Sequence, residues 1–84
     1  MYKIDVRPKA RKDMQRFPKE QQARVGAAID ELAVNPFVGK KLEGKFTGAW
    51  AIRVWPYRII YNIEREIVTV SIIRVKHRKD VYRP

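Results

Sequence analysis

Two periods of hydrophobic residues divide the chain into a helical part and a strand part. Alternating apolar residues in "YKIDV" predict a short strand at the start. Beyond Pro8, apolar residues recur at intervals of three and four, which predicts one helix in "PKARKDMQRF" and a second in "KEQQARVGAAIDELAVN". Proline suits the first turn of a helix and cannot continue a preceding helix. Pro8 and Pro18 therefore mark the starts of the first and second helix, and Pro36 marks the end of the second. The two segments are expected to form a helical hairpin.

The period changes to two in the second half of the chain, and three strands are expected there. They lie in "WAIRVW", in "YRIIYNI" and, after a turn around Glu64 and Arg65, in "EREIVTVSIIRVK". The short turns between them predict an antiparallel meander. Residues 36–48, which hold three of the four glycines, are expected to form a loop that reaches the core through Phe37 and Leu42.

The expected element order is therefore β-α-α-β-β-β, and the fold class is α+β. A sheet of this kind buries one face under its helices. We expect a helical hairpin packed on a small, mainly antiparallel sheet. A single domain over residues 1–84 is expected, because a chain of 84 residues leaves no room for a second core.

One detail of the predicted meander conflicts with stability. If Trp55 and Pro56 form the tip of the first hairpin, Arg53 lies directly opposite Arg58 on the sheet face away from the helices. Two like charges in that position destabilise a strand pair by up to about 1 kcal/mol. Such conflicts often mark functional sites, and two converging guanidinium groups suit a bound phosphate. The alternative is that both side chains simply point into water.

Composition and charge narrow the chemistry. The chain has no cysteine, which excludes a disulfide framework and thiol catalysis. Its single histidine and scattered acidic residues do not form a metal-ligand pattern, so neither a metal nor a cofactor is expected. The sequence shows neither a signal-peptide pattern nor a membrane-spanning run, and we expect a cytoplasmic protein. The 19 Lys and Arg residues outnumber the 9 Asp and Glu residues, for a net charge of +10. This excess favours a polyanionic partner, nucleic acid or an acidic protein, over a merely solvated basic surface.

The last expected strand runs directly into a basic tail that holds the only histidine, "KHRKDVYRP". Since this strand pairs with "YRIIYNI", its end is expected near the start of that segment, which would bring His77 and Arg78 close to Arg58. RNA can be cut without a metal when a base takes the proton of the attacking 2′-OH, an acid protonates the leaving 5′ oxygen and cations stabilise the phosphate. His77 is a candidate acid or base, and Tyr82 a candidate proton donor or stacking group. A purely structural histidine is the alternative.

Further candidate contacts to nucleic acid flank these residues. Trp55, at the expected hairpin tip, can stack on a base or meet a partner protein, or it closes over Leu42 or Phe46. The other candidates are lysines of the loop and of the tail: Lys41, Lys45, Lys76 and Lys79.

Two long segments, "KKLEGKFTGAWAIRVWPYRIIYNIE" and "SIIRVKHRKDVYR", resemble the RelE/ParE superfamily of type II toxins. The expected element order and the chain length agree with this resemblance. It implies a small microbial-ribonuclease-like sheet with a helical hairpin packed on it. Within the superfamily, RelE-type members cleave mRNA in the ribosomal A site, and ParE-type members inhibit DNA gyrase.

The resemblance also implies which residues form the site. By similarity, the basic residues of the RelE-type sheet fall on Arg53 and Arg58. The arginine after the last strand falls on Arg78 and the tyrosine of the tail on Tyr82, and many relatives that end in "HRKDVY" carry a histidine where His77 stands.

There is one departure from the pattern. The strand position two residues before Arg53 is basic in relatives and is Ala51 here. His77, Lys41 or Lys45 are candidates to replace the missing basic group, and weaker activity is the alternative.

The function implied by the resemblance is that of a ribosome-dependent mRNA endonuclease. Its expected partners are the ribosome, mRNA and a cognate antitoxin that neutralises it in a hetero-oligomer. Two alternatives stay open: a ParE-type gyrase inhibitor, and a basic module that binds RNA or antitoxin without catalysis.

Overall fold

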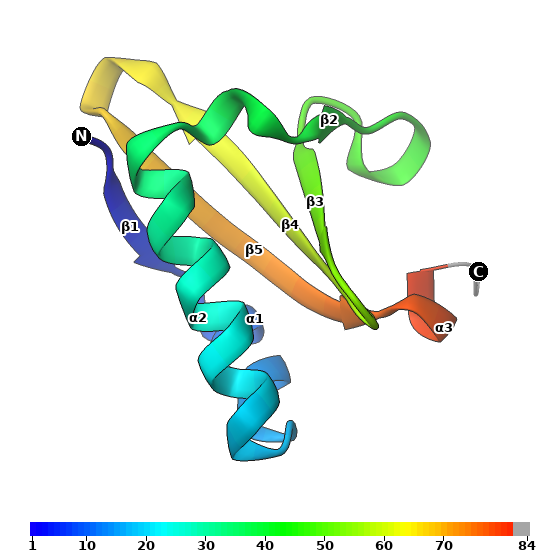
Figure 1. Cartoon of the computed structure of the whole chain (residues 1–84). Helices are drawn as coiled ribbons and strands as arrows, with labels where there is room; N and C mark the ends of the chain where they lie inside the picture. The colour runs from blue at the N-terminus through cyan, green and yellow to red at the C-terminus, as the bar shows by residue number, and fades with distance from the viewer. Residues whose placement is uncertain (82–84) are drawn as a thin grey trace.

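The structure is a computed structural model and describes residues 1–81 (Figure 1). Its helices and strands, in chain order, are β1 (Lys3–Val6), α1 (Pro8–Gln15), α2 (Lys19–Val34), β2 (Lys40–Lys41), β3 (Trp50–Val54), β4 (Tyr57–Glu64), β5 (Thr69–His77) and α3 (Arg78–Val81). Three short 3₁₀ turns connect them: η1 (Pro36–Val38), η2 (Gly44–Phe46) and η3 (Arg65–Ile67). Within residues 1–81, no helix is both long and apolar enough to cross a lipid bilayer.

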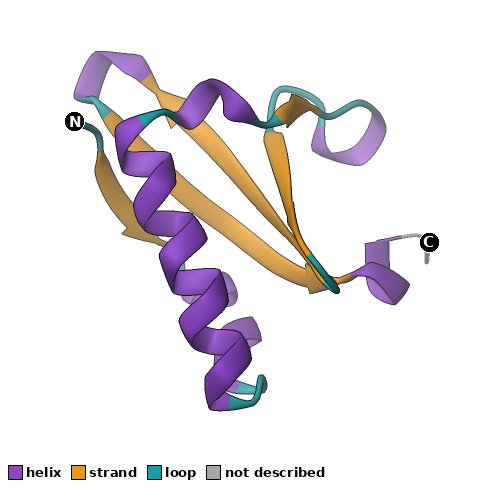
Figure 2. Cartoon of the chain, viewed as in Figure 1, coloured by secondary structure: helices purple, strands orange, loops and turns teal. Residues whose placement is uncertain are grey.

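The five strands form one sheet in the order β1-β5-β4-β3-β2 (Figure 2). β1 runs parallel to β5, and every other neighbouring pair is antiparallel. Both long helices pack on the same face of the sheet, and the opposite face stays open. The expected α+β class, with a helical hairpin on a mainly antiparallel sheet, is confirmed.

The core lies between the hairpin and the covered face of the sheet. The period of α2 buries Val25, Ile29 and Leu32, and α1 adds Ala10, which is fully buried. Alternate residues of the central strands face them: Tyr57, Ile59, Tyr61, Val70, Ile72 and Val75. The hydrophobic pattern of the sequence therefore identifies the core correctly.

The segment expected as a loop, residues 36–48, contains more structure than its composition suggests. Its residues Lys40–Lys41 form β2, which pairs with β3 as an edge strand of the sheet, and η1 and η2 flank this strand. The buried hydroxyl of Tyr61 donates a hydrogen bond of 2.6 Å to the Pro36 carbonyl and anchors the segment to the sheet. Gly39 is required beside it, because a Cβ there would meet the Tyr61 hydroxyl and lie 2.7 Å from the Ala51 carbonyl. Phe37 does not reach the core as expected and remains 40% exposed.

The third strand of the meander starts later than expected. The chain turns through η3, and Val68 then adopts a left-handed conformation with φ of 49°. This conformation is unfavourable for a β-branched residue and normally taken by glycine or asparagine. Thr69 therefore begins β5, whereas the sequence pattern predicts a strand directly after Glu64 and Arg65.

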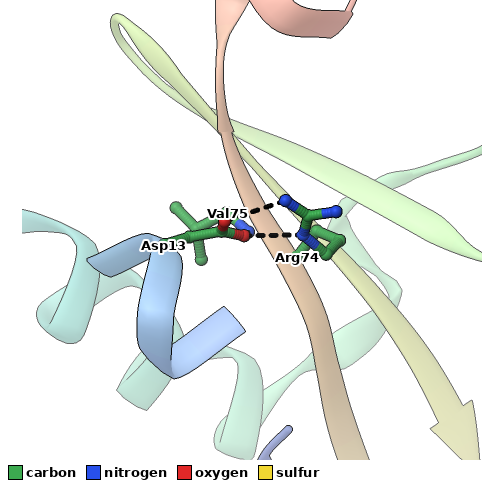
Figure 3. A network of polar contacts seen from close by, with 3 residues as sticks. All are labelled: Asp13, Arg74 and Val75. Carbon is green, nitrogen blue, oxygen red and sulfur yellow. Dashed lines mark hydrogen bonds and ion pairs between the residues drawn. The ribbon is translucent and has the colours of Figure 1, made fainter. Parts of the chain in front are cut away.

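A carboxylate of α1 closes the edge of β5 beyond the point where β1 ends (Figure 3). The Val75 N–H group donates to Asp13 Oδ2 at 3.0 Å, where a neighbouring strand would otherwise accept. The guanidinium of Arg74 holds the same carboxylate with two hydrogen bonds, of 2.8 and 2.9 Å. Helix α1 is thus fixed to the part of β5 that leads into the basic tail.

The surroundings of Asp13 favour its ionised form. Burial alone would raise the pKa of this carboxyl. The hydrogen bonds from Arg74 and Val75, with the positive charges of Arg74 and Lys76, outweigh burial and hold the pKa below its ordinary value of 3.8. The stabilisation is complete above that ordinary value, and it is lost as the pH falls through the lowered pKa of the folded state.

Asp13→Asn should lower the free energy of unfolding at pH 7 by about 1.5–3 kcal/mol, since it removes a charge-assisted acceptor from both Arg74 and Val75. Urea unfolding at pH 7 and at pH 3 would measure this, and the difference from the parent protein should shrink at pH 3. Asp5→Asn is the matched control, because its pair with Arg7 is exposed on both sides and worth little. An Asp13→Asn protein as stable as the control at pH 7 would contradict the assignment.

Candidate functional site

A row of cations crosses the open face of the sheet. Arg53 lies directly opposite Arg58 in the β3–β4 pair, as the sequence predicts. Arg58 in turn lies opposite Lys76 in the β4–β5 pair. Residues directly opposite each other project to the same side of a sheet, so the three cations share one face.

Arg78 joins this row from the start of α3. Its N–H group donates to the Pro56 carbonyl at 2.8 Å, which holds the strand end against the hairpin tip. Arg78, Arg53, Arg58, Trp55, Pro56 and Tyr57 line a cavity of about 120 Å³, called the arginine cleft below. Three guanidinium groups around one small cavity form a site suited to a phosphate.

Trp55 forms an exposed aromatic wall of the arginine cleft. Its side chain is 60% exposed, and the Arg78 guanidinium lies 4.7 Å from the centre of its ring. Arg24 of α2 donates from Nη1 to the Trp55 carbonyl at 2.8 Å and so ties the tip to the helix. No local pattern in the sequence indicates this role of Arg24, because the two residues are 31 positions apart.

A larger cavity of about 560 Å³ adjoins the arginine cleft and shares Arg53 and Arg58 with it. Its walls come from the 38–42 segment and from β3, including Lys40, Lys41 and Ala51. Lys40 lies directly opposite Ala51 and therefore projects to the same face as Arg53. Lys40 is thus the lysine that lies next to Ala51 on the open face. It was missed because β2 was expected to be loop.

The partner of Lys41 lies on the other side of the sheet. Lys41 is opposite Trp50, and its Nζ lies 5.5 Å from the centre of the Trp50 indole. Trp50 packs against the core. Lys41 is therefore engaged with an aromatic ring, although it still lines the larger cavity.

The end of β5 lies beside the start of β4, as expected, but the His77 side chain projects to the face of the sheet away from Arg58. His77 lies opposite Tyr57, and its ring meets that of Tyr57 edge-on at 5.7 Å. Tyr57 itself stacks on Phe17, in the turn between α1 and α2, with ring centres 4.0 Å apart, so His77 faces the helices. Its Nδ1 accepts a hydrogen bond from the Lys79 N–H group at 3.2 Å.

A β-bulge explains this difference. Ile60 pairs with Arg74 and Tyr61 with Ile72, which leaves Ile73 without a partner in β4. Without this extra residue, the register set by the turn would put His77 on the side of Arg58. The bulge exchanges the two faces, so that Lys76 points to the open side instead.

The remaining predicted residues lie around the end of β5. Lys45, Lys76 and His77 line a cavity of about 340 Å³ at the edge between α1 and β5, together with Arg16 and Asp13 among others. Lys79 is exposed in α3. Tyr82 lies outside the described residues.

The fold and site can be compared with known proteins. Residues 4–82 match the family described as the ParE toxin of type II toxin-antitoxin system, parDE. The chain belongs to the RelE/ParE superfamily of type II toxins. The match spans almost the whole toxin and includes every residue of the arginine cleft.

Individual relatives agree with this membership. Toxin RelG of Mycobacterium tuberculosis is 37% identical over 84 residues, which cover 98% of this chain and 97% of that protein. The toxin in the RelBE2 toxin–antitoxin complex of Mycobacterium tuberculosis has 33% identity and a TM-score of 0.84, covering 90% of this chain and 96% of that one. The isolated RelE toxin of Escherichia coli is 22% identical with a TM-score of 0.79, over 92% of this chain and 84% of that one, and shares the fold.

Replacing Arg53 by threonine should stabilise the toxin at low salt by a few tenths to about 1 kcal/mol, because it removes a like charge opposite Arg58. The gain should shrink in about 1 M NaCl, where exposed charges are screened within about 3 Å. Urea unfolding of Arg53→Thr and of the control Lys3→Thr would test it. The control loses the same charge on β1 opposite Thr69. An Arg53→Thr protein no more stable than Lys3→Thr would argue that the two arginines do not repel.

Proposed function

We propose that this toxin is an endoribonuclease that cleaves mRNA during translation, on the ribosome, and that a cognate antitoxin neutralises it. The observation that supports this most is the arginine cleft, in which Arg53, Arg58 and Arg78 surround one cavity beside an exposed aromatic ring. A gathering of cations without compensating carboxylates stabilises charge on a phosphate, and the ring offers a face to a nucleobase.

The proposed reaction is an internal transfer at phosphorus. The 2′ oxygen of the nucleotide before the cut attacks the adjacent phosphorus, and its proton passes to a base. The bond from phosphorus to the 5′ oxygen breaks, and that oxygen takes up a proton. The products are a 2′,3′-cyclic phosphate and a free 5′-hydroxyl, so the route requires neither a metal nor a cofactor.

Each residue of the cleft has a proposed role. Arg53 and Arg58 hold the non-bridging oxygens of the phosphate in a clamp made of two strands. Arg78 stabilises the charge that develops on the leaving side, and Trp55 stacks on a base next to the cut. Tyr82 positions the nucleotide. No acid or base role is proposed for His77, because its ring packs on the other side of β5.

Other cations extend the surface for RNA. Lys40 and Lys76 lie next to the clamp on the open face, opposite Ala51 and Arg58. The remaining proposed RNA contacts are Lys41, Lys45 and Lys79. With a net charge of +10, the toxin suits binding to rRNA and mRNA through their phosphates.

The antitoxin is proposed from the solved relatives. The 33% identical toxin was crystallised in a toxin–antitoxin complex, and so was an archaeal RelE from Pyrococcus horikoshii with 27% identity. A hetero-oligomer with an antitoxin in the cytoplasm is the corresponding proposal for this chain.

Primer extension on a translated reporter mRNA tests the activity. Purified bacterial ribosomes and the toxin are incubated with the mRNA, with and without translation. New 5′ ends within the codon at the A site, seen only during translation, are the expected result. Intact mRNA in the presence of folded toxin would refute it.

Gyrase inhibition is the second candidate function. The family model that matches is named for ParE. Ala51 also stands where the resemblance to RelE-type toxins implies a basic residue. A DNA supercoiling assay with purified gyrase separates the two functions. Loss of supercoiling with intact mRNA would favour the ParE type.

Arg58→Ala should reduce the rate of mRNA cleavage by at least about 10²-fold, as expected for a lost electrostatic contact to the reacting phosphate. His77→Ala should retain the rate within about tenfold, since an acid or base at the reacting atoms would contribute about 10²–10⁴. Single-turnover cleavage of the two variants measures both effects. Equal losses in both would contradict the placement of His77 outside the site.

Lys40→Ala should slow cleavage more than Lys41→Ala, because only Lys40 lies beside Ala51 on the face of the clamp. The Ala51→Lys variant should restore part of the rate in the Lys40→Ala background. Cleavage rates of the three proteins at one ionic strength provide the test. The idea fails if Lys41→Ala is the slower of the two single variants.

A further inference from the structure

The imidazole of His77 makes a hydrogen bond that the proposed reaction does not use. Its Nδ1 accepts from the Lys79 N–H group at 3.2 Å. His77 is the last residue of β5, and α3 begins at Arg78, so the histidine stands at the N-cap position of this helix. A side chain at that position stabilises a helix by accepting from the second or third N–H group, and Lys79 is the second residue of α3.

Helix α3 depends on contacts of this kind because it has only 4 residues. A helix of that length is not stable by itself, and the N–H groups of its first turn have no partner inside the helix. The Arg78 N–H group donates to the Pro56 carbonyl at 2.8 Å, and the Lys79 N–H group donates to His77. The first two N–H groups of α3 are therefore both bound by groups outside the helix, one at the hairpin tip and one on the imidazole.

The ring of His77 is oriented by aromatic side chains of the covered face. It meets the ring of Tyr57 edge-on, with an angle of 89° between the two planes. Tyr57 is buried and is itself stacked on Phe17. A ring that is already packed loses little rotamer freedom when it accepts a hydrogen bond. The core of the toxin therefore holds Nδ1 ready for the first turn of α3.

The cap lies beside the residue that connects α3 to the arginine cleft. Arg78 is the first residue of the helix, between His77 and Lys79, and its guanidinium lies against the ring of Trp55. The backbone of the first turn sets the direction of this side chain. Fraying of that turn would release the Arg78 guanidinium from the cleft. His77 thus acts on the cleft through Arg78, from the opposite side of β5.

Only a neutral imidazole can form this cap. A neutral ring carries one proton, and Nδ1 accepts a hydrogen bond when that proton is on Nε2. A protonated ring has two N–H groups and no acceptor. Histidine side chains usually change charge between about pH 5 and 8. The cap is therefore complete at the alkaline end of this range and is lost as the pH falls and the ring takes up a proton.

Several charged and titratable side chains lie around the same ring. Tyr57 packs against it from β4. Two carboxylates and four cations line the cavity of about 340 Å³ together with His77: Asp13, Asp80, Arg16, Lys45, Arg74 and Lys76. Since Nδ1 bonds to a backbone N–H group, a substitution at position 77 separates the cap from any effect of pH on these neighbours.

We propose that His77 is a positioning residue whose neutral imidazole caps α3 and holds Arg78 in the arginine cleft, so that the toxin becomes less active as the ring is protonated. This inference rests on the proposed endonuclease activity and adds a dependence on pH to the same site. His77 touches neither the phosphate nor the reacting oxygens. Its effect on the rate is therefore that of a helix cap and not that of an acid or base.

The test compares two variants that carry the same amide at different reach. In His77→Asn, the side-chain oxygen is as many bonds from the backbone as Nδ1, and it can accept from the Lys79 N–H group whether or not the pH is acidic. In His77→Gln, the amide is one bond further away, at the level of Nε2, and does not reach that group. Cleavage of translated mRNA by the full-length parent and both variants is measured under single-turnover conditions from about pH 5.5 to 8. Rates are expressed relative to His77→Asn at the same pH, which removes any effect of pH on the ribosome.

At about pH 8, the parent and His77→Asn should cleave at rates within about twofold, and His77→Gln should be about fivefold slower, as is typical for a lost cap. Toward about pH 5.5, the parent should slow relative to His77→Asn and approach His77→Gln. Urea unfolding confirms that all three proteins are folded. If His77→Gln does not fold, the ratio of the parent rate to the His77→Asn rate must still fall with the pH.

Two results would overturn the proposal. A loss of about 10²-fold or more in both variants at every pH would assign His77 an acid or base role instead. A ratio of parent to His77→Asn that does not change with pH would show that protonation of the imidazole leaves Arg78 in place.

An NMR titration separates this proposal from the proposed activity. The amide proton of Lys79 should move upfield in the parent as His77 is protonated, because its hydrogen bond is lost, and should stay constant in His77→Asn. A parent toxin that shows this change but leaves mRNA intact would refute the endonuclease and retain the cap. A parent toxin that cleaves mRNA while the Lys79 amide proton ignores the protonation of His77 would refute the cap alone.

Discussion

One extra residue in β5 determines which side chains meet on each face of the sheet. Before the bulge at Ile73, Val70 and Ile72 point to the helices, and after it Val75 and His77 do. The bulge allows β5 to keep its apolar residues under α1 while Lys76, near its end, projects to the open face. Asp13 binds the strand immediately after the bulge, at Arg74 and Val75. The bulge and this carboxylate together give the strand end a defined orientation.

The open face of the sheet holds like charges whose repulsion opposes folding. Arg53, Arg58 and Lys76 lie in adjacent positions of three neighbouring strands, where opposite charges would be more stable. The toxin tolerates this repulsion because the covered face of the same strands is filled with aromatic and branched residues. The strands therefore have one face that stabilises the sheet and one that is suited to an anion.

The periodicity of hydrophobic residues predicted the helices and strands that are long enough to show a period. The two helices and the three long strands followed from periods of 3.6 and two, and the pairing of Arg53 with Arg58 followed from a hairpin tip at Trp55 and Pro56. The two-residue strand β2 could not be predicted, because two residues show no period, and Lys40 was missed with it. The orientation of His77 depended on a bulge that leaves no mark in an apolar run such as "VSIIRV". The contact of Arg24 with the hairpin tip required the packed tertiary structure.

Helix α2 reaches both ends of the toxin. Its first turns carry Arg24, which donates a hydrogen bond to the carbonyl of Trp55, and its last residue is the exposed Val34. With 16 residues, the helix is about 24 Å long and stiff along its axis. This one helix therefore links the hairpin tip to the opposite end of the sheet. Through the hydrogen bond from Arg24, the exposed tryptophan of the arginine cleft has a backbone support that comes from a helix on the other face of the sheet.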